Sequence, residues 1–211
     1  MTVAAKICGL STPDTVDAAI AHGARWVGFM TYPRSPRHVA TEALRVLATR
    51  VPPAVGKVGV FVDPDDALLD ERLAAGAFDL LQLHGEESPS RLVDIKRRTG
   101  KPVMKVIKVA GKQDVERGMA LYAGVVDRLM FDAAEGTLPG GNAQAFDWAI
   151  FSGRTVPVPW LLAGGLTADN VAEAVRATGA RAVDVSSGVE ASRGVKSVEL
   201  IRAFLAKTAL L

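Results

Sequence analysis

Short runs of β-branched and aliphatic residues alternate with longer amphipathic segments along the whole chain. The short runs are typical of strands, and apolar residues spaced three and four apart are typical of helices. The runs predict strands at 3–8, 26–31, 55–62, 78–83, 102–108, 126–132, 158–163 and 182–186. The segments between them predict helices at 12–22, 41–50, 65–75, 87–99, 112–122, 145–152, 167–178 and 197–207.

A strand followed by a helix, repeated eight times, predicts parallel strands covered by helices. Eight such units favour a closed (βα)8 TIM barrel, and 211 residues suit the compact end of that fold. A doubly wound open sheet is the alternative, but no G-x-G-x-x-G fingerprint follows the first predicted strand. Because no linker or composition break interrupts the chain, we expect residues 1–211 to form one domain.

The alternation within the predicted strands indicates which residues face the barrel interior. Successive residues of a strand point to opposite sides, and in a barrel these sides are the helix layer and the interior. Aliphatic residues occupy one side of the first, fourth, sixth and eighth strands, which suits the helix layer, so the other side should point inward. The last inward residues of these four strands are Cys8, His84, Asp132 and Ser186. They should ring the C-terminal mouth, where barrel enzymes hold their catalytic groups.

Composition and charge narrow the class of protein. The chain is 49% hydrophobic and 23% charged, as in ordinary globular proteins, and its formal net charge of +2 gives no general attraction to nucleic acid or an anionic membrane. A single cysteine is typical of a reducing compartment. The N-terminus does not resemble a signal peptide, and no apolar run approaches the roughly 20 residues of a membrane span. We therefore expect a cytoplasmic protein.

Five ionisable inward residues each allow a structural and a functional interpretation. Cys8 is either a small buried side chain or an ionisable thiol at the working face, and ionising it at pH 7 would require about 2 kcal/mol of local stabilisation. Asp132 is either a hydrogen-bonded residue at a loop start or an acid. Lys6 and Asp184 lie deeper on inward faces, where a buried ion pair is the favoured interpretation. His84 is more commonly a hydrogen-bonded histidine than a catalyst.

Two segments suit a phosphate group. Gly164 and Gly165, after the seventh strand, let backbone N–H groups approach an anion, and Thr167 is placed to cap the next helix. Ser186, Ser187 and Gly188, after the eighth strand, can form an anion-binding concavity. Either segment alone could be an ordinary turn, but the loops after strands seven and eight are the usual phosphate site of the barrel fold. We therefore expect a small phosphorylated molecule as the substrate.

Two further loops have distinctive compositions. The loop at 32–38 holds two prolines and two arginines, so it is either a solvated basic loop or one that presents an arginine to a substrate carboxylate. The loop at 133–145 is long for a barrel and contains Gly136, Gly140 and Gly141, which makes it a candidate lid.

Six motifs, in this order along the chain, resemble those of one family. They are Lys6-Ile7-Cys8-Gly9, Gly28-Phe29 followed by Ser35-Pro36-Arg37, Gln82-Leu83-His84-Gly85, Phe146-Asp147-Trp148, Ala163-Gly164-Gly165-Leu166 and Asp184-Val185-Ser186-Ser187-Gly188-Val189-Glu190. From about Lys6 to the last helix, the sequence resembles the phosphoribosylanthranilate isomerases of tryptophan biosynthesis.

The resemblance implies an Amadori rearrangement of N-(5-phosphoribosyl)anthranilate to 1-(2-carboxyphenylamino)-1-deoxyribulose 5-phosphate. It makes Cys8 the general base, Asp132 the general acid and Arg37 the partner of the anthranilate carboxylate. His84 joins the substrate-binding set, and the phosphate belongs to the loops with Gly164, Gly165, Ser186, Ser187 and Gly188. No metal or organic cofactor is implied, and we expect a monomer or a homodimer.

Two segments depart from the family pattern, and two other functions compete with the one that the resemblance implies. The usual G-G-T-G or G-G-S-G reads Gly140-Gly141-Asn142-Ala143, and the usual G-x-K-D reads Gly194-Val195-Lys196-Ser197. The ring-opening isomerase of histidine biosynthesis is a related barrel, but that family has an aspartate where Cys8 stands. A non-catalytic barrel that senses a sugar phosphate would leave Cys8 and Asp132 unexplained.

Overall fold

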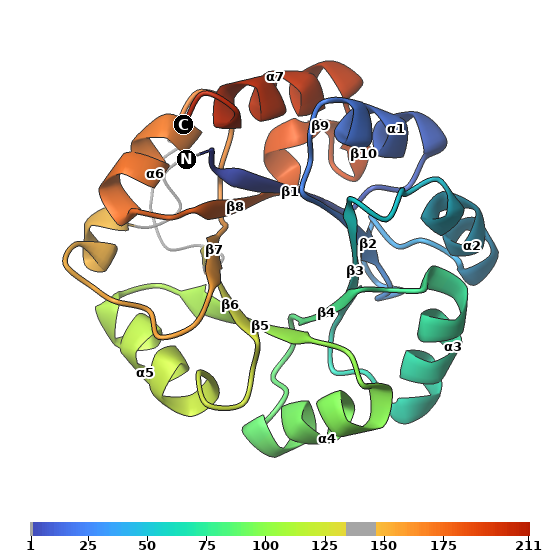
Figure 1. Cartoon of the computed structure of the whole chain (residues 1–211), viewed down its shortest axis with the longest axis horizontal. Helices are drawn as coiled ribbons and strands as arrows, with labels where there is room; N and C mark the ends of the chain where they lie inside the picture. The colour runs from blue at the N-terminus through green and yellow to red at the C-terminus, as the bar shows by residue number, and fades with distance from the viewer. Residues whose placement is uncertain (1, 134–146) are drawn as a thin grey trace.

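The structure is a computed structural model that describes residues 2–133 and 147–211. Strands β1 to β8 form a closed barrel in chain order, with parallel neighbours and with β1 paired to β8 (Figure 1). The strands are β1 (Ala4–Cys8), β2 (Trp26–Met30), β3 (Gly56–Phe61), β4 (Leu80–Leu83), β5 (Val103–Val109), β6 (Arg128–Ala133), β7 (Trp160–Leu162) and β8 (Ala182–Val185). The surrounding helices are α1 (Pro13–Ala21), α2 (Thr41–Thr49), α3 (Asp66–Gly76), α4 (Pro89–Thr99), α5 (Lys112–Tyr122), α6 (Val171–Thr178) and α7 (Val198–Thr208). The predicted TIM barrel is confirmed.

Two apolar clusters confirm the predicted alternation of the strands. The residues at one parity fill the barrel interior: Val58, Leu80, Met104, Val106, Met130, Leu161, Ala163 and Ala182. The aliphatic residues at the other parity, among them Leu81, Leu129 and Val183, pack into the larger cluster beneath the helices. The polar residues that share the interior parity, including Lys6 and Asp132, therefore belong to the barrel side of their strands.

The predicted helix at 145–152 is wrong for the residues that the structure describes. Trp148–Phe151 form a short 3-10 helix, η1, which begins where the Asp147 carboxylate accepts a hydrogen bond from Ala149 N at 2.9 Å. The Phe151 ring stacks on Trp160 with centroids 5.1 Å apart. Trp148 and Phe151 are both buried, so a single short turn is enough to pack this apolar segment against the core.

The chain after β7 also differs from the prediction. Helix α6 begins at Val171 rather than at 167, and Thr167 does not cap it, because its hydroxyl accepts from Asp169 N in the preceding turn. A 3-10 helix, η2 (Ser187–Val189), and an antiparallel pair, β9 (Glu190–Ser192) and β10 (Val195–Lys196), follow β8. The Ser197 hydroxyl accepts from Leu200 N, so this serine caps α7.

Two further predictions concern the loop at 133–145 and membrane crossing. The candidate lid at 133–145 lies outside them except for Ala133, which ends β6. Within 2–133 and 147–211, none of the helices combines the length and the apolar character that a bilayer crossing needs.

Candidate active site

A buried ion pair joins the first and last strands of the barrel. Lys6 on β1 is in register with Asp184 on β8, and the Lys6 Nζ donates to Asp184 Oδ1 at 2.7 Å. Lys6 is fully buried, and a buried charge is costly unless a partner of opposite charge compensates for it. The predicted pairing of Lys6 with Asp184 is therefore confirmed.

Cys8 ends β1, one inward position above Lys6, and a glycine makes room for both side chains. Its register partner on β2 is Gly28, and Cys8 itself is buried. A Cβ atom on Gly28 would lie 3.0 Å from the Lys6 Nζ and 3.1 Å from the Cys8 Sγ. Any larger residue at this position would displace the ammonium or the sulfur, so the glycine of the Gly28-Phe29 motif is explained by close approach.

The electrostatic surroundings of Cys8 act in opposite directions. Burial raises the pKa of the Cys8 thiol, Lys6 lowers it, Asp184 raises it and Lys196 lowers it, and the net result is a raised pKa. The protein without substrate therefore favours the neutral thiol at pH 7. The two lysines only partly offset the cost of placing a negative charge in this buried position.

His84 connects the ends of β4 and β6. Its Nε2 lies 3.4 Å from the Asp132 Oδ2, and its Nδ1 lies 3.3 Å from the Nε2 of Gln82. With the amide oriented in this way, Gln82 donates to Nδ1, so a neutral ring carries its proton on Nε2, facing Asp132. His84 and Asp132 are both half-buried, as expected of side chains at the rim of a mouth.

Arg37 forms a bidentate ion pair with Glu190. Its Nε and Nη2 donate to the two carboxylate oxygens at 2.6 and 2.9 Å. Lys196 Nζ donates to Glu190 Oε1 at 2.7 Å and also to the carbonyl oxygen of Ser186 at 2.8 Å. Glu190 thus links the loop after β2 to the segment that follows β8.

The charges of this cluster shift its ionisation. Burial by itself would raise the pKa of Glu190, but hydrogen bonds from Arg37, Lys196 and Gly194 N outweigh burial and lower the pKa to about 2. The hydrogen bond to Glu190 raises the pKa of Arg37 further. Arg37 and Glu190 line a polar hollow together with Ser187, Ser192 and Arg193. Arg37 therefore lies beside the predicted phosphate loop as a permanent cation.

The two predicted phosphate loops pack directly on each other. A Cβ atom on Gly188 would lie only 1.9 Å from the carbonyl oxygen of Leu166, so the loop after β8 reaches the loop after β7 only with glycine at this position. Gly164 and Gly165 have φ angles of +90° and +64°, which favour glycine. The Ser186 hydroxyl donates to Cys8 O at 3.3 Å, which ties the same loops to the end of β1.

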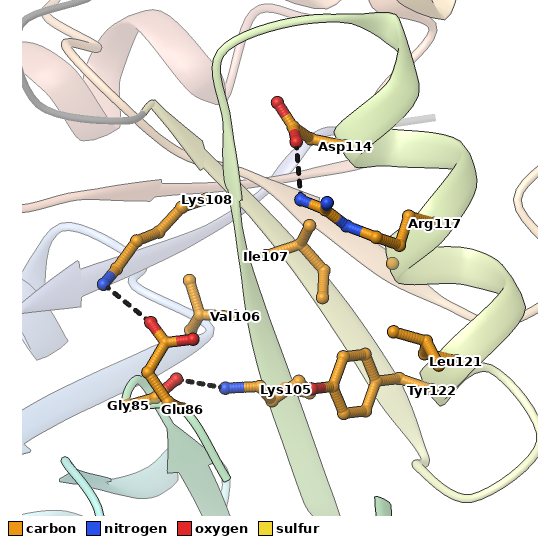
Figure 2. Close-up of a pocket in the computed structure, with 11 residues that line it drawn as sticks. Gly85, Glu86, Lys105, Val106, Ile107, Lys108, Asp114, Arg117, Leu121 and Tyr122 are labelled. Carbon is orange, nitrogen blue, oxygen red and sulfur yellow. Dashed lines mark hydrogen bonds and ion pairs between the residues drawn. The ribbon is translucent and has the colours of Figure 1, made fainter. Parts of the chain in front are cut away.

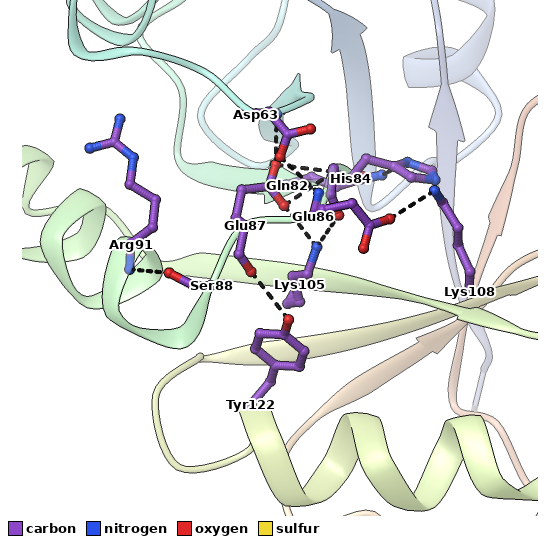
Figure 3. A network of polar contacts seen from close by, with 11 residues as sticks. Asp63, Gln82, His84, Glu86, Glu87, Ser88, Arg91, Lys105, Lys108 and Tyr122 are labelled. Carbon is purple, nitrogen blue, oxygen red and sulfur yellow. Dashed lines mark hydrogen bonds and ion pairs between the residues drawn. The ribbon is translucent and has the colours of Figure 1, made fainter.

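The loop after β4 is held by a buried carboxylate (Figure 3). Glu87 accepts hydrogen bonds from the backbone N–H groups of Asp63 and Gly85 and pairs with Lys105 Nζ at 2.7 Å. Lys105 also donates to Gly85 O at 2.6 Å. These contacts fix the backbone of the residue that follows His84, so they hold the histidine at the mouth.

A cavity of about 350 Å³ lies beside this loop, between β5 and α5 (Figure 2). Its charged lining residues form pairs: Lys108 with Glu86 at 3.2 Å, and Arg117 with Asp114 at 2.8 Å. Lys108 is also the register partner of Asp132, so the rim of the cavity lies next to the part of the mouth that holds Asp132.

The contacts bring most of the sequence-predicted site residues into three groups. His84 meets Asp132, Ser186 meets Cys8, and Arg37 shares its hollow with Ser187. The sequence interpretation missed Glu190 as the partner of Arg37 and Lys196 as a second cation bound to Glu190, although both stand in the quoted motifs. The sequence signals these two residues only weakly, as charged residues that follow soon after the eighth predicted strand.

A family profile described as N-(5'phosphoribosyl)anthranilate (PRA) isomerase matches residues 5–207. The chain belongs to this family. Among curated members, N-(5'-phosphoribosyl)anthranilate isomerase of Rhodospirillum centenum is 53% identical over 215 residues, with 100% of both chains covered. The Paracoccus denitrificans enzyme is 51% identical, with 98% of this chain and 97% of the relative covered.

Solved structures of phosphoribosylanthranilate isomerases have the same fold. The Thermotoga maritima structure has a TM-score of 0.88 at 32% identity, covering 99% of this chain and 100% of its own. A structure of the isomerase in complex with reduced 1-(o-carboxyphenylamino)-1-deoxyribulose 5-phosphate has a TM-score of 0.86 at 30% identity, with the same coverage. That ligand carries a phosphate and a carboxylate.

Proposed function

We propose that this chain rearranges N-(5'-phosphoribosyl)anthranilate to 1-(2-carboxyphenylamino)-1-deoxyribulose 5-phosphate, with Asp132 as general acid and Cys8 as general base. The observation that carries this assignment is that, in one closed barrel, Cys8 is the last residue of β1 and Asp132 is the last but one of β6, so both belong to the C-terminal ends of their strands. The matched family and the complexed relative support the substrate.

Substrate orientation would depend on two groups at the mouth, the phosphate loops and Arg37. The loops that contain Gly164, Gly165, Ser186, Ser187 and Gly188 would hold the phosphate with backbone N–H groups. Arg37 would face the anthranilate carboxylate with the edge of its guanidinium that Glu190 does not use. Holding the phosphate and the carboxylate would fix the ribose between acid and base, so that each proton transfer takes place between groups already in position.

The chemistry needs one proton donor and one proton acceptor. Asp132 gives a proton to the ribose ring oxygen, the C1′–O bond breaks, and a Schiff base forms between C1′ and the anthranilate nitrogen. The electron demand of the Schiff base acidifies the C2′ proton, which Cys8 in its thiolate form removes. The resulting enolamine tautomerises to the ketone, so all atoms of the substrate remain in the product.

His84 fits a supporting role for the acid. Its Nε2 faces Asp132, and Gln82 and the loop fixed by Glu87 hold its ring. In this role His84 would orient the Asp132 carboxyl.

The decisive experiment follows the fluorescence decay of phosphoribosylanthranilate. Purified wild type should consume the substrate, and Cys8→Ala and Asp132→Asn should each turn over about a hundredfold more slowly or worse. Asp70→Asn, which changes an exposed carboxylate on α3, is the matched control and should keep normal turnover. No decay with wild type would refute the function, and normal decay with Cys8→Ala would refute the role of Cys8.

The location and assembly of the protein form part of the proposal. The lone cysteine and the small-molecule chemistry support the cytoplasm. A Thermotoga maritima relative is described as dimeric, and for this chain we propose a monomer or a homodimer, built from one domain over 1–211. Sedimentation at several protein concentrations would distinguish the two.

A further inference from the structure

A thiol whose pKa is raised can act as a base only if another group stabilises its thiolate form. Cys8 is buried at the end of β1, and among the residues that the structure describes the charged groups that act on its sulfur are Lys6, Asp184, Lys196 and Arg37. Of these, Lys196 and Arg37 are both bound to Glu190. Neighbouring β2 contributes no charge, because it presents Gly28.

Lys6 is the cation in the best position. Its Nζ and the Cys8 Sγ lie 3.0 and 3.1 Å from one point, the position that a Cβ of Gly28 would occupy. The two atoms are therefore no farther apart than the sum of these distances, a range in which an ammonium stabilises an anion strongly in a buried setting. Lys6 is fully buried, so water screens this interaction little.

Asp184 competes with the sulfur for the same ammonium. Its Oδ1 accepts from Lys6 Nζ at 2.7 Å, and the carboxylate is itself buried. A negative charge at this place neutralises part of the field of Lys6 and repels a second negative charge on Cys8. Electrostatics support both effects, since Lys6 lowers and Asp184 raises the pKa of the thiol.

We propose that Lys6 is a positioning residue that stabilises the ionised form of Cys8 from below, and that Asp184 limits this stabilisation by sharing the Lys6 ammonium. This inference rests on the proposed function for its catalytic meaning, because it explains how a buried thiol becomes a base. Lys6 itself lies one inward position beneath the mouth and acts through Cys8.

The test titrates the thiol directly. Cys8 is the only cysteine of the chain, so thiolate absorbance near 240 nm, measured against Cys8→Ala to remove the tyrosine signal, reports this one sulfur. Asp184→Asn should move the titration midpoint of Cys8 down, and Lys6→Met should move it up, each by about one pH unit or more. Lys96→Met, which removes a partly exposed lysine from α4, should leave the midpoint unchanged.

A double variant protects the test against misfolding. Lys6→Met leaves the buried Asp184 carboxylate without its partner and could prevent folding, whereas Lys6→Met with Asp184→Asn removes both charges. The double variant and Asp184→Asn alone differ only at Lys6, so the double variant should titrate at the higher pH. Midpoints that stay in place, or that move in the same direction for Lys6→Met and Asp184→Asn, would overturn the proposal.

Kinetics then separate this proposal from the proposed function. The rising limb of the dependence of kcat on pH should follow the titration midpoints, at nearly constant KM, because Lys6 does not contact substrate. Shifted midpoints with an active Cys8→Ala protein would mean that Lys6 controls a thiol that is not the base. An inactive Cys8→Ala protein with fixed midpoints would leave Cys8 as the base and reject Lys6 as its stabilising group.

Discussion

At the scale of single residues, the pairing of Arg37 with Glu190 limits how the arginine can take part in the proposed substrate binding. Glu190 uses the Nε–Nη2 edge of Arg37, so in the proposed function the substrate carboxylate would approach the other edge of the guanidinium. Glu190 also neutralises the buried Lys196. One carboxylate thus fixes the direction of the arginine and compensates for a second cation.

Glu190 should make the stability of the protein depend on pH in a defined window. Its pKa in the folded protein is lowered from 4.5 to about 2, so its charged form stabilises the fold above pH 4.5 and this contribution disappears as the pH falls toward 2. Urea unfolding of wild type and Glu190→Gln should give a difference in free energy that is constant from pH 7 to about pH 5 and then shrinks.

Glu42→Gln is the control for this measurement. Glu42 forms an exposed i,i+3 pair with Arg45, and such pairs contribute little. Its difference from wild type should be small at every pH. A difference for Glu190→Gln that stays constant between pH 5 and pH 2 would contradict the interpretation.

At the scale of elements, the buried pair of Lys105 and Glu87 ties strand β5 to the loop after β4 (Figure 3). Both side chains are almost fully buried, and Glu87 also binds backbone N–H groups of two loops. Because removing one partner of a buried pair leaves an uncompensated charge, Lys105→Met should lower the free energy of unfolding by about 3–5 kcal/mol. Urea denaturation measures this loss.

Lys108 provides the matched comparison on the same strand. It pairs with Glu86 at the surface, so Lys108→Met should cost no more than about 1 kcal/mol. Replacing both members of the buried pair, with Lys105→Met and Glu87→Leu, should recover part of the loss. Equal losses for Lys105→Met and Lys108→Met would show that burial does not decide the strength of these pairs.

The sequence predicted the strands and helices that a local periodic pattern determines. It did not predict the features that depend on contacts between residues far apart in the chain. The alternation of Leu129, Met130 and Phe131 was enough to place Asp132 on the inward side. Arg37 and Glu190 are 153 positions apart in the sequence, so no local sequence pattern predicts their interaction. The 3-10 turn at Trp148–Phe151 likewise depends on stacking against Trp160, which only the folded barrel supplies.

At the scale of the whole molecule, the barrel has two apolar layers with different freedom to rearrange. The inner layer contains Met130 and is enclosed by a ring of hydrogen-bonded strands, whereas the outer layer lies beneath helices. Helices can shift toward a vacated space more easily than a closed ring of strands can contract. The same side-chain deletion should therefore leave a larger cavity inside the barrel than beneath the helices.

Methionine substitutions in the two layers test this difference. Met130 is fully buried inside the barrel, and Met119 on α5 is partly buried against the outer layer. Met130→Ala should lower the free energy of unfolding by about 2–5 kcal/mol, because the ring of strands keeps the cavity open. Met119→Ala should cost clearly less, since its site is partly exposed and its helix can move inward. Urea denaturation of both variants gives the comparison, and similar losses would mean that the closed ring relaxes as readily as the helix layer.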